Sequence, residues 1–114
     1  MVEREGEAFS NEDLEGLVER VEERIAREIE KKLGRRSQYV VVISLRRASG
    51  GAIDLGIDLQ IFSHTGGRGR LGEIAEEVIE SGFDEAERHI KRSWKRAGRD
   101  LEEEKDSYSF TSVG

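Results

Sequence analysis

Residues 39–62, which read YVVVISLRRASGGAIDLGIDLQIF, decide the fold of this chain. Apolar side chains occupy every second position in each half, and the two halves are separated by small residues. This alternation predicts two antiparallel strands that bury one face. The buried positions are expected at Tyr39, Val41, Ile43 and Leu45, and at Ile53, Leu55, Ile57, Leu59 and Ile61.

The small residues between the strands set the register of this hairpin. Pairing Leu45 with Leu55 leaves a three-residue turn at 49–51, with glycine where positive φ is required. The same register places Arg46 opposite Asp54 on the outer face, where they can form a cross-strand ion pair.

A helix is predicted on each side of the hairpin. The first spans 11–33, with Ser10 and Asp13 as a capping box, Phe9 stapled onto Leu14, and Gly34 as the C-cap. The second spans about 72–98. Small residues run down its apolar face, namely Ala75, Gly82, Ala86, Ser93 and Ala97. Residues 81–82 could interrupt this helix, but the apolar phase continues through them and favours one helix.

The predicted class is therefore α+β, with a helix, an antiparallel β-hairpin and a helix (αββα) in one domain over 10–101. Residues 1–9 are expected to form an acidic arm. Residues 102–114 are expected to form a tail, in which Tyr108 and Phe110 alternate and can add a short strand.

Composition narrows the functional classes. The chain has no cysteine, so disulfides, thiolate nucleophiles and cysteine-ligated zinc are excluded. Its 19 Glu and 14 Arg, with few thermolabile residues, are typical of a thermophile's surface. No membrane span or signal peptide is recognisable, which predicts a soluble, cytoplasmic protein. The net charge of −6 gives no general reason to expect nucleic acid as a partner.

The hairpin itself predicts self-association. Two strands alone are marginally stable and leave both sheet edges open. Val40, Val42 and Phe62 also fall on the outer face, where they are too apolar for a fully solvated surface. We therefore expect a homo-oligomer, most simply a dimer that forms a four-stranded sheet or a stacked pair.

Residues 66–72 form a glycine-rich loop with two arginines, and from Gly67 onward they match G-x-G-x-x-G. A dinucleotide site needs a parallel strand after the helix and a closing acidic residue, and neither is predicted. A weaker anion or RNA site remains, built from Arg35, Arg36, Arg68 and Arg70 at a helix N-terminus. The alternative is a simple loop whose arginines pair with nearby carboxylates such as Glu73.

The basic tract 88–96 combines cations with Trp94, a pattern that also occurs in nucleic-acid contacts. Its helical spacing instead places Trp94 in the core, with the tract facing the acidic N-terminal half of the first helix.

His64 and His89 fit no metal-ligand or triad spacing. Asp54 and Asp58 are expected to be solvated rather than metal-bound. No catalytic residue, metal or cofactor is expected, which predicts a non-enzyme.

The order of helix, hairpin and helix over 12–96 resembles a small archaeal protein family of unknown function. It also resembles the dimer-forming Pcc1 subunit of the archaeal KEOPS tRNA-modifying complex. These resemblances imply an archaeal, non-catalytic subunit of a larger assembly. The glycine–arginine loop is similar to that of double-stranded-RNA-binding domains, although Glu73, Glu76 and Glu77 stand where that fold presents lysines.

Two functional hypotheses follow. The first is a non-catalytic structural or protein-interaction module that self-associates. The alternative is an RNA- or phosphate-binding module that uses the basic loop.

Overall fold

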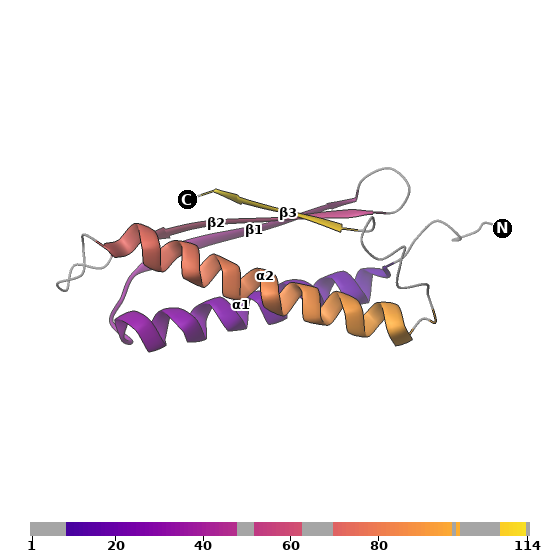
Figure 1. Cartoon of the computed structure of the whole chain (residues 1–114), viewed down its shortest axis with the longest axis horizontal. Helices are drawn as coiled ribbons and strands as arrows, with labels where there is room; N and C mark the ends of the chain where they lie inside the picture. The colour runs from indigo at the N-terminus through magenta and orange to yellow at the C-terminus, as the bar shows by residue number, and fades with distance from the viewer. Residues whose placement is uncertain (1–8, 48–51, 63–69, 97, 99–107, 114) are drawn as a thin grey trace.

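The computed structural model describes residues 9–47, 52–62, 70–96, 98 and 108–113. Two helices lie on one face of a three-stranded sheet, as Figure 1 shows. The predicted α+β class and αββα order are confirmed, and a C-terminal strand follows. The elements are α1 (Asn11–Leu33), β1 (Tyr39–Arg47), β2 (Ile53–Ile61), α2 (Leu71–Arg96) and β3 (Tyr108–Val113).

The sheet order is β1-β2-β3. β1 and β2 pair antiparallel in the predicted register, with Leu45 opposite Leu55, while the predicted turn at 49–51 lies outside the described residues. β3 pairs parallel to β2, with Ile53 opposite Tyr108. Two expectations are therefore wrong: the hairpin does not leave both edges open, and a parallel strand does follow the second helix. Among the described residues, β1 remains an open edge.

β3 is held in place by contacts with α2 as well as by its pairing with β2. The rings of Phe83 and Phe110 stack with their centroids 4.7 Å apart. The Tyr108 hydroxyl donates a hydrogen bond of 3.2 Å to Glu87. The short strand expected through Tyr108 and Phe110 is therefore present, and the domain extends beyond its predicted boundary at residue 101.

The capping box predicted for α1 is present. The Ser10 side chain accepts from the Asp13 backbone, and the Asp13 carboxylate accepts from the Ser10 backbone, both at 3.1 Å. Gly34 ends the helix with a φ of 92°. Phe9 was assigned to the N-terminal arm, but its side chain is buried with its ring centroid 5.6 Å from that of Trp94. The core thus begins before the helix.

α2 is continuous through residues 81–82, which confirms one helix. A Cβ atom added at Gly82 would lie 3.1 Å from Ile57 Cδ1 and 3.3 Å from the side chain of Ile25. Glycine at this position therefore allows α2 to approach both α1 and the sheet closely. This contact explains why small residues run along the centre of the helix face.

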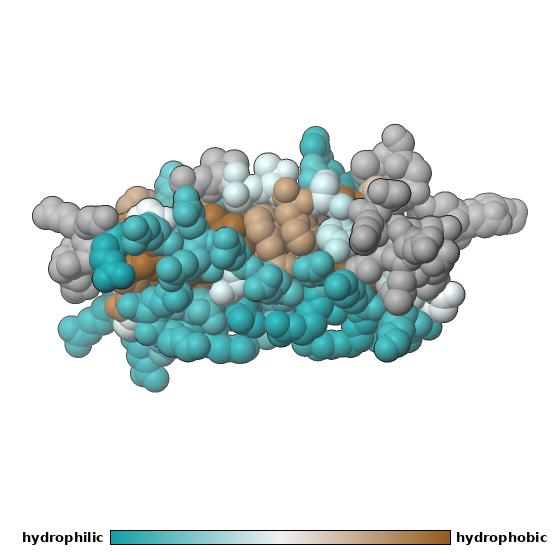
Figure 2. All heavy atoms as spheres, viewed as in Figure 1, coloured by the Kyte–Doolittle hydropathy of each residue, from teal (hydrophilic) through white to brown (hydrophobic). Residues whose placement is uncertain are grey.

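The core lies between the helices and β2. The helix-facing side chains of β2 from Ile53 to Leu59 are at most 2% exposed. Those of β1 are only partly buried, because β1 lies at the edge of the sheet. Figure 2 shows hydrophilic residues over the helices and apolar residues along the seam between helices and sheet. Within the described ranges, neither helix has the length and apolarity that crossing a membrane requires.

Candidate interaction surface

The outer face of the sheet carries an apolar patch, formed by Val40, Val42 and Phe62. Their side chains are 52%, 54% and 53% exposed. The Phe62 backbone donates a hydrogen bond of 2.8 Å to Gln38, which places Phe62 diagonally beside Val40. The three side chains predicted to form an interface therefore gather at one corner of the outer face.

A polar hollow of about 380 Å³ lies beside this outer-face patch. It forms around Gly56, where an added Cβ atom would lie 2.7 Å from the Ser44 hydroxyl oxygen. Asp54, at its side, accepts hydrogen bonds from Ser109 at 2.9 Å and from Arg46 at 3.2 Å. Both hydrogen bonds lower the pKa of the Asp54 carboxyl below its ordinary value of 3.8, and the bond from Ser109 has the larger effect. The predicted Arg46–Asp54 pair is thus confirmed, and the carboxylate is charged at neutral pH.

The open edge of β1 presents backbone groups in an alternating pattern. The bond from Phe62 to Gln38 makes these two residues a hydrogen-bonded pair. Hydrogen-bonded and non-hydrogen-bonded pairs alternate along an antiparallel ladder. Even-numbered residues of β1 therefore bond to β2, whereas the N–H and C=O groups of Val41, Ile43 and Leu45 point away from it. In the described part of the chain, the β1 residues with unpaired backbone groups are therefore the same residues whose side chains face the helices.

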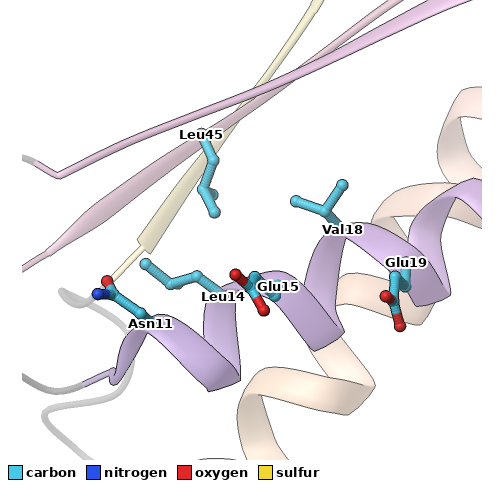
Figure 3. A pocket seen from close by; sticks show the side chains of 6 residues that line it. All are labelled: Asn11, Leu14, Glu15, Val18, Glu19 and Leu45. Carbon is cyan, nitrogen blue, oxygen red and sulfur yellow. The ribbon is translucent and has the colours of Figure 1, made fainter.

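Two hollows lie between α1 and this edge, and we call them together the α1–β1 groove. One end is a hollow of about 480 Å³, in which Leu14 and Val18 of α1 approach Leu45 of β1 (Figure 3). Glu15 and Glu19 lie on the outer side of the helix at the same hollow. Farther along α1, a second hollow of about 330 Å³ lies between the helix and the beginning of β1. The groove thus has an apolar floor and an acidic rim.

Both ends of the α1–β1 groove are tied by hydrogen bonds. At one end, the Arg47 guanidinium donates to the Phe9 carbonyl and to the Asn11 side chain, both at 3.1 Å. At the other, Arg35 pairs with Glu30 at 2.8 Å, between α1 and the segment that leads into β1. These contacts join α1 to the segments at both ends of β1.

The arginines predicted to bind an anion are only partly placed. Arg35 and Arg36 precede β1, and Arg70 precedes α2 at the same end of the hairpin, whereas Arg68 lies outside the described residues. Arg70 lies 4.0 Å from Glu73, an exposed pair within one helical turn. The contacts of Arg35 and Arg70 thus follow the alternative in which arginines pair with nearby carboxylates.

The prediction for the basic end of α2 is confirmed for Trp94, but the described ion pairs do not show the expected charge match with the acidic N-terminal half of α1. Trp94 is 3% exposed and belongs to the core. The ion pairs described for the tract stay within α2, as between Lys91 and Glu87 at 3.8 Å. Two ion pairs join α2 to α1 outside this tract. One links Arg24 to Glu85 at 3.2 Å, and the other links Lys32 to Glu77 nearer the other end of the helices.

His89 packs against α1 beside Gly16. Within the described ranges, neither ring nitrogen finds a hydrogen-bond partner of good geometry. Burial lowers the pKa of His89 below 6.5, and the charges of Arg20 and Arg92 act in the same direction, while Asp13 opposes them. His64 lies outside the described residues, and those residues contain no group of three or more potential metal ligands.

Comparisons with protein-family models, curated proteins and solved structures found no match to this chain. Sequence reasoning found the outer-face patch but missed the α1–β1 groove, because Leu14, Val18 and Leu45 follow the pattern of core residues. The available signal was the pair of glutamates, Glu15 and Glu19, directly beside them.

Proposed function

We propose that this protein is a non-catalytic interaction module, which self-associates through the outer face of its sheet and acts as a subunit of a larger complex. The observation that carries the proposal is the gathering of Val40, Val42 and Phe62, each more than half exposed, in one patch. Because each side chain is already about half buried, covering what remains would stabilise an association by about 1 kcal/mol per side chain. A second copy stacked on the outer face would cover all three.

The size of the outer face predicts how strong this association is. β1 and β2 have nine residues each and β3 has six. At standard strand spacing and rise, the face measures roughly 14 by 30 Å. Stacking would bury about 800 Å² over both copies, which is below the ~1,200 Å² of most stable interfaces. We therefore expect a dimer that dissociates on dilution.

Charge favours a dimer in which two outer faces stack over one in which two β1 edges pair. The exposed side of α1 along β1 carries Glu15, Glu19 and Glu22. A twofold axis between two β1 strands would bring these rows of carboxylates from both copies side by side. Repulsion between like charges opposes that arrangement, whereas the outer face carries the Arg46–Asp54 pair and the apolar patch.

The proposal is tested by light scattering coupled to size-exclusion chromatography, from micromolar to millimolar protein. Wild type should move from monomer to dimer as concentration rises, and the double variant Val42→Asp/Phe62→Asp should remain monomeric. Arg27→Asp, on the exposed surface of α1, is the control and should dimerise like wild type. Circular dichroism establishes that each variant is folded. An unchanged mass for the folded double variant would contradict the proposal.

The same run examines the alternative function. Nucleic acid bound to Arg35, Arg36, Arg68 and Arg70 would raise the absorbance at 260 nm, and salt would remove it. A protein peak that carries salt-sensitive nucleic acid and shows no dimer would favour the RNA- or phosphate-binding module.

A further inference from the structure

We propose that the α1–β1 groove binds an extended, cationic segment of another protein, which joins the sheet as a fourth strand beside β1. This surface differs from the outer-face patch, so the inference goes beyond the proposed self-association. It rests on three features of the groove: unpaired backbone groups, an apolar floor and an acidic rim.

The backbone of β1 is suited to strand addition. Val41, Ile43 and Leu45 direct their N–H and C=O groups away from β2, and no described residue pairs with them. An added strand would satisfy these groups with main-chain hydrogen bonds, which supply affinity independently of sequence. Since the edge groups recur at every second residue, the added segment must be extended rather than helical.

The side chains of the groove select what that segment carries. Every second residue of an added strand would point toward the helical layer. There it would pass Leu45 and Val18 before reaching Glu15 and Glu19. Lysine and arginine suit this path, because their aliphatic stems cover apolar surface while their charged ends remain at the rim. The alternate residues would lie on the outer side of the sheet, where β-branched side chains favour the strand conformation.

The carboxylates along the rim are largely unmatched. Glu15, Glu19 and Glu22 are exposed and recur at helical spacing on the β1 side of α1. None of the ion pairs that the described residues form includes these three, whereas Glu30 is paired with Arg35. The unmatched negative charge therefore lies along the central and N-terminal part of the groove.

Charge also argues against two other occupants. A second copy placed edge to edge would bring its own acidic rim against this one. The chain's own residues before Phe9 include Glu3, Glu5 and Glu7 with a single arginine, so their sign is the same as that of the rim. A cationic segment from a different protein has the complementary charge.

The probe is a fluorescein-labelled synthetic peptide of alternating lysine and threonine, about eight residues long, to match the length of a typical strand. A peptide of alternating glutamate and threonine with the same length is its control. Anisotropy at low salt should show that the wild-type protein binds the lysine peptide and not the glutamate peptide. Equal binding of both peptides, or binding of neither, would overturn the proposal.

Two matched variants locate the site. Glu15→Gln/Glu19→Gln removes two rim charges, and Glu76→Gln/Glu80→Gln removes two exposed charges at the same spacing on α2. The rim variant should weaken binding about tenfold, since each of the two exposed charge pairs that it removes contributes modestly to affinity. The α2 variant should bind like wild type. Equal weakening in both variants would show a general charge effect and contradict the groove.

A structural readout separates strand addition from loose electrostatic binding. On saturation with the lysine peptide, amide exchange at Val41, Ile43 and Leu45 should slow by more than that at Val40 and Val42. Binding without this protection would overturn the proposal. The Val42→Asp/Phe62→Asp variant should bind the peptide even when it no longer dimerises, so failure of self-association and failure of groove binding give different results.

Discussion

β1 and β2 are neighbouring strands of equal length and similar alternation, yet they differ in how their inward side chains are covered. The inward residues of β2 from Ile53 to Leu59 are at most 2% exposed, whereas those of β1 are only partly buried. The difference follows from position, because β2 lies between two strands and β1 lies at an edge. β2 therefore contributes most of the sheet's share of the core, whereas β1 contributes to both of the proposed contact surfaces.

The sharpest test of this difference uses two leucines that face each other across the hairpin. Leu55 is fully buried in β2, and its partner Leu45 in β1 is partly exposed. Leu55→Ala should destabilise the fold by about 3–4 kcal/mol, because it leaves a cavity in the core. Leu45→Ala should cost about 1 kcal/mol, since solvent already reaches that site. Urea unfolding of dilute protein measures both, and equal losses would contradict the contrast between the strands.

A second pair of variants examines the helix packing that covers β2. Gly82→Val would force a side chain between α2, Ile25 and Ile57, and we expect a loss of about 2 kcal/mol from overpacking. Gly72→Ala is the control, since nothing lies within 4 Å of a Cβ atom at that position. It should stabilise the helix by up to about 1 kcal/mol. If Gly82→Val were neutral in thermal and urea unfolding, the close approach of α2 to the sheet would be wrong.

We expect His89 to make the packing between the two helices sensitive to pH. Its pKa in the folded protein is lowered from 6.5, so the unfolded chain binds the proton more readily. The stabilising effect of the neutral imidazole is therefore complete above pH 6.5 and is lost as the pH falls below it.

His89→Gln should flatten the dependence of melting temperature on pH between about 7 and 5.5, a window set by the ordinary histidine pKa. The comparison of interest is the slope, because the variant can also change stability at neutral pH. If the slopes of variant and wild type were the same, burial of the imidazole would not govern how stability changes over this pH range.

The smallest expected effect lies on the solvent-exposed outer face. The hydrogen bond from Ser109 is the first cause of the lowered pKa of Asp54. In Ser109→Ala, the midpoint of an NMR titration of the Asp54 carboxyl should rise toward 3.8 but stay below it, because Arg46 still donates to the carboxylate. An unchanged midpoint would mean that β3 does not bring Ser109 to Asp54.

Local patterns account for most of the elements. The alternation in 39–62 and the capping box at Ser10 predict the hairpin register and the start of α1, because each depends on residues close in sequence. The apolar phase that continues through residues 81–82 likewise predicts one continuous helix, and the small residues on its apolar face allow close packing. The outer-face patch follows from strand parity alone.

The parts that could not be predicted depend on contacts between distant segments. β3 is short, and its place beside β2 depends on packing of Phe110 against Phe83 as well as on backbone pairing. Phe9 precedes the helix in a polar segment, and its buried ring lies beside that of Trp94, which is distant in the sequence. The α1–β1 groove exists because an edge strand leaves Leu45 partly uncovered, and edge position is a property of the whole sheet.

The most direct test of the open β1 edge is residue-resolved amide hydrogen exchange on dilute, peptide-free protein. The structure predicts alternation along the strand: slow exchange at Val40, Val42 and Ser44, which bond to β2, and fast exchange at Val41, Ile43 and Leu45. Uniformly slow exchange at all six amides would mean that another segment already pairs with the edge. That result would contradict β1 as the open strand and, with it, the groove as a docking site.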